Sequence, residues 1–200
     1  MKTLGLTGGI ATGKSTVSAL LRDRYGVPLI DADQVARDIV QPGAPALEEI
    51  RQAFGEEVLL PDGTLNRTAL GRIVMADTAK RRVLEAITHP RIGQAIADWL
   101  STERAQGAAW AAVEAALMVE SGSYRAYDVL VVVSCSSETQ LARLRAREGF
   151  DQEVAQRWID AQLPLPEKEA VADHVLRNDD DLAQLEVAVA ELWRTLNPME

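Results

Sequence analysis

The chain is poor in cysteine and has no long apolar segment. Its one cysteine, Cys135, excludes an intramolecular disulfide and is typical of a protein from a reducing compartment. No stretch approaches the roughly 20 apolar residues that cross a bilayer, and the first residues show no secretory leader pattern. We therefore expect a cytoplasmic protein without a membrane partner.

The chain also has a deficit of basic residues, which bears on its partners. Asp and Glu number 30 against 21 Lys and Arg, a formal net charge of −9. This charge opposes nonspecific attachment to a phosphate backbone, so a polyanionic ligand has to be held by a local cluster of donors. We expect no nucleic acid partner, and no obligate protein partner is evident from the sequence.

Short apolar runs alternate with segments of helical periodicity, which predicts an α/β fold. The run at 129–133 is apolar at every position, as a strand buried on both faces of a parallel sheet requires. Five runs are predicted to form a parallel sheet between two helical layers: residues 2–7, 27–30, 110–115, 129–134 and 174–176.

The alternation breaks between about residues 34 and 107, where apolar residues repeat at helical spacing without an intervening strand. We expect one domain over residues 1–200. Its core is predicted at about 1–33, 108–136 and 173–200, with a helical insertion at about 34–107 and a helical lid at about 137–172.

The most specific motif is residues 8–15, which read Gly-Gly-Ile-Ala-Thr-Gly-Lys-Ser and match the phosphate-binding loop (P-loop) pattern. The motif follows a predicted strand and opens a predicted helix, so the amides of the loop and of the helix N-terminus converge on one anion. Lys14 is expected to reach the β- and γ-phosphates of ATP, and Ser15 to offer its hydroxyl to Mg²⁺. The expected nucleotide-binding residues are Gly9, Ile10, Ala11, Thr12, Gly13, Lys14, Ser15 and Thr16.

Two carboxylates follow the second predicted strand, at the sheet edge where α/β proteins bind ligands. Asp31 and Asp33 are two residues apart, so in extended chain they point the same way. One of them could accept the proton of an attacking hydroxyl. The alternative is that Asp33 caps a helix that starts near Gln34, and the two roles are compatible.

Two arginines of the predicted lid, Arg143 and Arg147, lie four residues apart on one face of a helix. They suit the charge of a transferring phosphoryl group, although solvated or ion-paired arginines are an alternative reading. Pro90 predicts the start of a further helix, with His89 just outside it as a possible cap.

At this point the residues resemble one family, the dephospho-coenzyme A kinases, over about residues 4–193. Residues 84–90, Leu-Glu-Ala-Ile-Thr-His-Pro, are the most diagnostic stretch. The other matches, in order, are 5–10, 31–33, 63–67 with Leu70, 120–122, 138–140 with Arg143 and Arg147, then Arg157, Gln162, Lys168, 172–173 and Asn178.

The resemblance implies a P-loop NTPase fold and transfer of the γ-phosphoryl group of ATP to the ribose 3′-hydroxyl of dephospho-coenzyme A, the last step of coenzyme A biosynthesis. It implies that Asp33 orients or deprotonates that hydroxyl, that Lys14, Arg143 and Arg147 act in catalysis, and that Asn178 lies by the adenine. It also implies that the insertion binds the acceptor. The implied acceptor-binding residues are Asp33, Arg67, His89 and Glu120.

Three features depart from the family pattern or stay open. Ala116 stands where the family usually has proline, and Asp179, Asp180 and Asp181 follow Asn178 where a glycine is common. The extra charge after Asn178 is suited to capping a helix that begins at Leu182. Glu114, at the end of the third predicted strand, is a weak candidate for a second acid near Mg²⁺.

Two other functions share parts of these motifs. Another P-loop kinase, acting on a nucleoside monophosphate or a small polyol acid, has the loop, the lid and the acid, but the match at 84–90 is not expected in it. A nucleotide-dependent switch has the loop as well, but the Asn-Lys-x-Asp guanine signature is absent from this sequence.

Overall fold

The computed structural model describes residues 1–198, so the last two positions of the expected core segment 173–200 lie outside it. No helix in the described part of the chain is both long and apolar enough to span a bilayer. The strands are β1 Lys2–Gly8, β2 Leu29–Asp31, β3 Trp110–Glu114, β4 Val129–Ser134 and β5 His174–Arg177. The α-helices are α1 Lys14–Tyr25, α2 Ala32–Asp38, α3 Pro45–Phe54, α4 Arg67–Ala76, α5 Thr78–Ala105, α6 Ser137–Glu148, α7 Gln152–Asp160, α8 Leu165–Glu169 and α9 Leu182–Leu196, with 3₁₀ turns at Glu56–Val58 and Ser123–Ala126.

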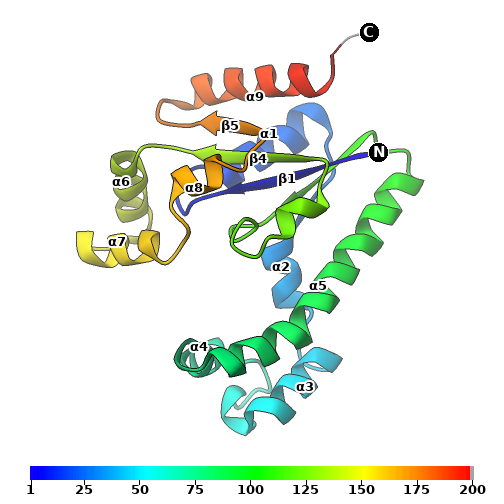
Figure 1. Cartoon of the computed structure of the whole chain (residues 1–200), viewed down its shortest axis with the longest axis vertical. Coiled ribbons are helices and arrows are strands. Elements are labelled where there is room, and N and C mark those ends of the chain that lie inside the picture. Colours follow the sequence, from blue (N-terminus) through cyan, green and yellow to red (C-terminus); the bar gives the residue numbers. More distant parts are fainter. Residues whose placement is uncertain (199–200) are drawn as a thin grey trace. The chain divides into compact units, whose positions relative to one another are not determined.

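The sheet has five strands in the order β2-β3-β1-β4-β5, which confirms the predicted α/β fold. Figure 1 shows β1, β4 and β5 side by side. β1 lies in the centre and pairs in parallel with β3 and with β4, and β4 pairs in parallel with β5. Because the strands are parallel, their carboxyl ends meet at one edge of the sheet. The loop that follows β1 therefore opens at this edge.

Helices α1 and α9 cover one face of the sheet. Leu4 and Leu6 of β1 are fully buried there against Val17 of α1 and Val189 of α9. On the other face, a Cβ atom at Gly5 would lie 2.8 Å from the sulfur of Met118, so only glycine lets this buried side chain reach the strand. Packing on both faces thus explains why β4 is apolar at every position from Val129 to Val133.

The described chain forms two compact units. One contains Met1–Ile30 and the chain from Glu103 onward, and the other contains Asp31–Thr102. The second unit consists of helices, with one isolated bridge between Leu59 and Leu65, and has its own apolar core. That core contains Val40, Ala46, Ile50, Phe54, Val58 and Leu70. The functional division into an insertion and a lid stays a prediction.

The expectation that a helix begins at Pro90 is wrong, because α5 runs through this residue and places His89 inside the helix. Proline removes one backbone hydrogen bond there but does not end the helix. Leu84 and Ile87, in the turns before Pro90, pack against the second core and hold those turns in place. Arg91 adds a side-chain hydrogen bond of 2.5 Å to the carbonyl of Ile87.

We predict that Ile50→Ala lowers the free energy of unfolding by about 2–5 kcal/mol, because the Ile50 side chain is 0% exposed and its truncation leaves a cavity. Met75→Ala is the control. Its side chain is 89% exposed, so a change within about 0.5 kcal/mol is expected. Urea unfolding of both variants measures the difference, and equal effects would show that the second core is not packed as described.

Candidate active site

The phosphate-binding loop, residues 9–13, connects β1 to α1. At two glycines of the motif, Gly8 and Gly13, any larger residue would clash or be strained. A Cβ atom at Gly8 would lie 2.5 Å from the carbonyl oxygen of Val133 on the neighbouring strand. Gly13 caps α1 with φ 94°, and Ala11 also has a positive φ of 61°. The chain therefore turns sharply in front of α1, whose N-terminal amides have no helical acceptor of their own.

Lys14 is held by a buried carboxylate. Its Nζ pairs with Oε1 of Glu114, and the other oxygen of Glu114 accepts a hydrogen bond from the Ser18 hydroxyl. Glu114 is only 8% exposed. The sequence left Glu114 as a weak candidate, and the structure places it in direct contact with the lysine of the motif.

The hydroxyl groups around Lys14 differ in their surroundings. Ser15, the second residue of α1, is exposed. The Thr12 hydroxyl is buried and donates to the Gly9 carbonyl at 2.9 Å, which closes the loop on itself. Within residues 1–198, no group of three or more His, Cys, Asp or Glu side chains could hold a metal ion.

Asn178 supports the loop from the end of β5. Its backbone N–H donates to the Ser134 carbonyl at 2.8 Å, and its Nδ2 donates to the Thr12 carbonyl at 2.8 Å. A Cβ atom at Gly13 would lie 2.1 Å from this Nδ2. Asn178 thus lies against the phosphate loop, in addition to any part it takes in adenine binding.

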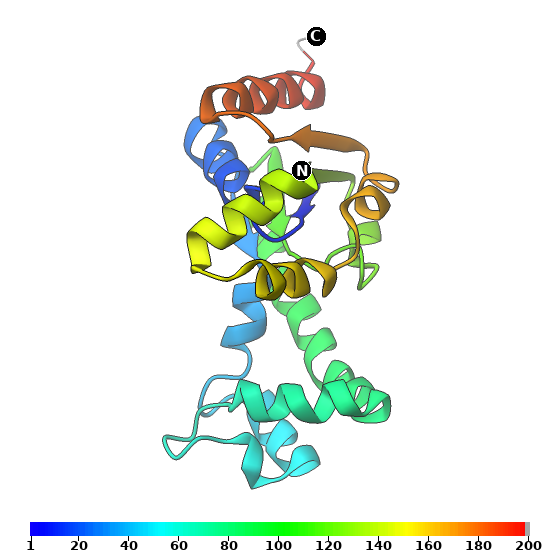
Figure 2. The ribbon, with the colours of Figure 1, turned by 90° about the vertical axis from the view of Figure 1, so that its left-hand side faces the viewer.

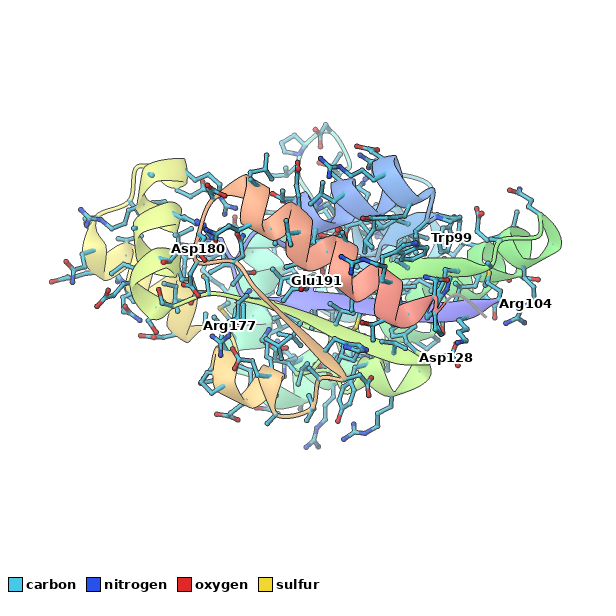
Figure 3. The ribbon with its side chains drawn as sticks, turned by 90° about the horizontal axis from the view of Figure 1, so that it is seen from above. Trp99, Arg104, Asp128, Arg177, Asp180 and Glu191 are labelled. Atoms are coloured by element: carbon cyan, nitrogen blue, oxygen red, sulfur yellow. The ribbon has the colours of Figure 1, made fainter. Side chains whose placement is uncertain are left out.

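The two arginines of α6 have different partners. Arg143 donates to the Asn178 carbonyl at 2.6 Å and to the Asp180 carbonyl at 3.2 Å, and Figure 3 shows Asp180 beside α6. Arg147 is exposed and pairs with Glu148 at 2.7 Å. The ion pair that the sequence left open as an alternative is therefore present at Arg147, and the structure does not bring the two guanidinium groups to one target.

Two of the aspartates after Asn178, Asp179 and Asp181, accept backbone hydrogen bonds through their side chains. Asp181 caps α9 by accepting from the Gln184 N–H at 3.0 Å, as the charge pattern suggested. Asp179 accepts from the Ser136 N–H at 2.6 Å, and this backbone hydrogen bond holds the pKa of its carboxyl below the usual range. The loop after β5 is thereby tied to the start of α6.

Glu120 is bound to a lysine that the sequence analysis did not select as a site residue. Lys168 is 0% exposed, and its Nζ lies 2.7 Å from Glu120 Oε1 and 2.9 Å from the Ala116 carbonyl. The same carboxylate oxygen accepts from the Leu163 N–H at 3.0 Å. The only signal for Lys168 was its place among the family matches, because burial of a lysine cannot be read from residue type.

Two glutamines that the sequence analysis also missed as functional residues bind the phosphate loop at Ile10. The Ile10 N–H donates to Gln162 Oε1 at 2.7 Å, and Gln140 Nε2 donates to the Ile10 carbonyl at 2.9 Å. Gln140 lies on the first turn of α6, and Gln162 lies between α7 and α8. Figure 2 looks onto the carboxyl ends of the strands and shows these helices there.

Both glutamines also line a cavity of about 450 Å³. Cys135, Leu165 and Glu169 are among its other lining residues. Burial raises the pKa of the Cys135 thiol, so this group stays protonated at neutral pH. The cavity therefore offers amide and carboxylate groups, but no thiolate nucleophile.

The remaining predicted residues belong to the second unit. Asp31 accepts from the N–H groups of Asp33 at 2.8 Å and of Gln34 at 3.3 Å, so Asp31 is the cap of α2. The alternative that Asp33 is the cap is therefore wrong. Arg67, the first residue of α4, and His89 within α5 are both exposed.

We predict that Gly13→Ala weakens ATP binding by at least about tenfold, because the new Cβ displaces Asn178 and disturbs amides that bind a charged group. Gly26→Ala is the matched control, since Gly26 also has a positive φ, 64°, but nothing lies within 4 Å of its Cβ position. The control is expected to lose about 1–2 kcal/mol of stability and to keep its ATP affinity. Calorimetric titration compares the two, and equal losses of affinity would contradict the clash with Asn178.

Known proteins resemble this chain over nearly its full length. A dephospho-CoA kinase from Geobacter sulfurreducens is 45% identical over 193 residues, which cover 96% of this chain and 98% of the relative. The crystal structure of TT1252 from Thermus thermophilus has a TM-score of 0.85 and 32% identity, with 98% of each chain covered. A dephospho-CoA kinase from Campylobacter jejuni has a TM-score of 0.71 and 28% identity, covering 97% of this chain and 96% of its own.

The family model described as dephospho-CoA kinase matches residues 2–184. This match includes the phosphate loop, the Lys14–Glu114 pair, Asn178 and α6. The chain belongs to the dephospho-CoA kinase family.

Proposed function

We propose that this protein transfers the γ-phosphoryl group of ATP to the ribose 3′-hydroxyl of dephospho-CoA, giving CoA and ADP in the last step of CoA biosynthesis. The observation that carries the proposal is an ordered phosphate loop with Lys14 at the start of α1, in a chain that the family model matches over residues 2–184. The acceptor oxygen forms a bond to the γ-phosphorus while the bond to the β–γ bridging oxygen breaks, and ADP leaves with that electron pair.

The phosphate loop is assigned to the triphosphate. The amides of Ala11 and Gly13, with those of the first residues of α1, are assigned to the anion in front of α1, where the helix N-terminus adds a partial positive charge. Lys14 is assigned to the γ-phosphate, because its ammonium is positioned by Glu114 and retains donors for a second partner. Together they stabilise charge on the transferring group.

Mg²⁺ fits this site because the side-chain atoms that could coordinate it are oxygens. Magnesium is usually held by one or two protein oxygens together with substrate phosphates, and it favours hard ligands. The exposed hydroxyl of Ser15 is suited to be such a ligand, and we assign it to Mg²⁺. The ion supplies charge neutralisation to the phosphates when it is bound.

The acceptor is assigned to residues carried over from the family. Asp33 orients the 3′-hydroxyl and accepts its proton, and the capping of α2 by Asp31 supports this because it removes the need for Asp33 as cap. Arg67 and His89 offer exposed polar groups on helices, suited to a large anionic acceptor. Glu120, fixed by its pair with Lys168, is assigned to the acceptor as well.

We assign the lid function to α6 and its two arginines, Arg143 and Arg147. Arg147 is exposed and forms a surface ion pair with its neighbour Glu148. Because such a pair is weak, the guanidinium can exchange this partner for a phosphoryl oxygen. Arg143 supports the loop that contains Asn178, which is assigned to the adenine. We place the reaction in the cytoplasm, with small-molecule substrates and no nucleic acid, membrane or obligate protein partner.

A panel of acceptors tests the function. With MgATP, stoichiometric ADP release is expected with dephospho-CoA, and negligible release with AMP, CMP or shikimate. Mass spectrometry of the product is expected to show CoA. Preferred turnover of any other acceptor in the panel would identify a different P-loop kinase, and release independent of acceptor would identify a nucleotide hydrolase.

We predict that Asp33→Asn slows turnover by about 10²- to 10⁴-fold with little change in ATP affinity, because the amide cannot accept the proton of the hydroxyl. Asp38→Asn is the control on the same helix, where the exposed carboxylate accepts from the Gln34 side-chain amide at 2.8 Å. Single-turnover kinetics with dephospho-CoA separate chemistry from product release. Near-normal turnover of Asp33→Asn would remove Asp33 from the catalytic residues.

A further inference from the structure

The orientation of the peptide planes in the phosphate loop is controlled by side chains outside the loop. A trans peptide is planar, and its N–H and C=O groups point in opposite directions. A protein group that binds the carbonyl of one plane therefore also sets the direction of the N–H in the same plane. In an anion-binding loop this direction decides whether the amide can reach a phosphate.

The plane between Ile10 and Ala11 is set by Gln140. Its Nε2 donates to the Ile10 carbonyl at 2.9 Å, so the Ala11 N–H points away from Gln140. This arrangement goes with φ 61° at Ala11, a conformation that a residue with a Cβ adopts at a cost in free energy. Rotation of this plane would relieve the cost and turn the Ala11 N–H away. The hydrogen bond from Gln140 opposes that rotation.

The Gly9–Ile10 and Thr12–Gly13 planes are fixed in the same manner. The Ile10 N–H donates to Gln162 Oε1 at 2.7 Å, which turns the Gly9 carbonyl toward the Thr12 hydroxyl that donates to it. The Thr12 carbonyl accepts from Asn178 Nδ2 at 2.8 Å, so the Gly13 N–H points away from Asn178. Since the Ile10 N–H donates to Gln162 and the Thr12 N–H donates to the Gly9 carbonyl at 3.3 Å, the phosphate donors of the loop centre are the amides of Ala11 and Gly13.

We propose that Gln140 and Gln162 are positioning residues for phosphoryl transfer, which aim the Ala11 amide at the phosphates by holding both backbone groups of Ile10. Gln140 is the principal one, because it is only 4% exposed and opposes the strained φ of Ala11 directly. Both glutamines lie in the segment 137–172, so the segment that contains the lid helix also holds the phosphate loop in its binding conformation. This inference rests on the proposed use of ATP.

The test removes each hydrogen bond without adding charge. Gln140→Met and Gln162→Met keep a long side chain but lose the amide, and Gln156→Met is the matched control, because Gln156 is exposed and donates to Asp160 on α7. Gln140→Met is expected to weaken ATP binding by about 10- to 100-fold, the effect of one lost hydrogen bond to a charged group, and Gln162→Met by a smaller factor. AMP, which lacks the β- and γ-phosphates, is expected to bind all variants equally in calorimetric titrations.

A rescue variant separates positioning from packing. Glycine adopts a positive φ without the steric cost, so Ala11→Gly in the Gln140→Met background is expected to recover at least about threefold in ATP affinity. A residue that only fills space would show no such recovery. If Gln140→Met fails to fold in a urea titration, Gln162→Met at its partly exposed position decides the question by whether it loses ATP affinity while AMP affinity stays unchanged.

The outcomes separate this inference from the proposed function. Equal ATP affinity in wild type and Gln140→Met, or equal losses for ATP and AMP, overturns the positioning role. Wild-type protein that binds ATP but does not phosphorylate dephospho-CoA overturns the proposed function alone. Selective loss of ATP affinity together with recovery by Ala11→Gly supports the inference.

Discussion

The site depends on one constraint: the phosphate loop has to leave its N–H groups open to an anion while its carbonyl groups are bound by the protein. The loop satisfies one of its own carbonyls, because the Gly9 carbonyl accepts from the Thr12 hydroxyl at 2.9 Å, but other carbonyls need partners from outside the loop. Here the carbonyls of Ile10 and Thr12 accept from the side-chain amides of Gln140 and Asn178. The loop is therefore a cradle only because residues more than a hundred positions away in the sequence complete it.

The electrostatics of the loop also depend on residues that are remote in sequence. The chain carries a net charge of −9, yet its proposed ligand is a polyanion. Lys14 lies in a largely buried ion pair with Glu114, so the loop's cation is positioned before a ligand arrives. Another lysine, Lys168, is fully buried and paired with Glu120. Since both lysines are paired with carboxylates, the site for phosphates relies on the position of Lys14 and on directed amide groups more than on net charge.

Much of this could be predicted from the sequence, because the signals were local. The apolar runs predicted the five strands to within about two residues of their observed ends, and the cap at Asp181 follows from aspartates before an amphipathic segment. The expected helix start at Pro90 was wrong, and so was the alternative that Asp33 caps a helix, because local preference did not decide either one. Local preference favoured a helix start at Pro90, but packing of Leu84 and Ile87 against a core extends the helix through it. Similarly, either aspartate could have capped α2, and the backbone conformation selected Asp31.

The sequence by itself determined the alternation of strands and helices, the phosphate-loop motif and the family, since each depends on residue type and spacing along the chain. Only the tertiary structure decided which side chains hold the loop. Gln140, Gln162, Asn178 and Glu114 are distant from the loop in sequence, and no local pattern distinguishes them from other polar residues. Their roles arise because a parallel sheet gathers the ends of β1, β3, β4 and β5 at one edge, where chain segments remote in sequence come into hydrogen-bonding distance.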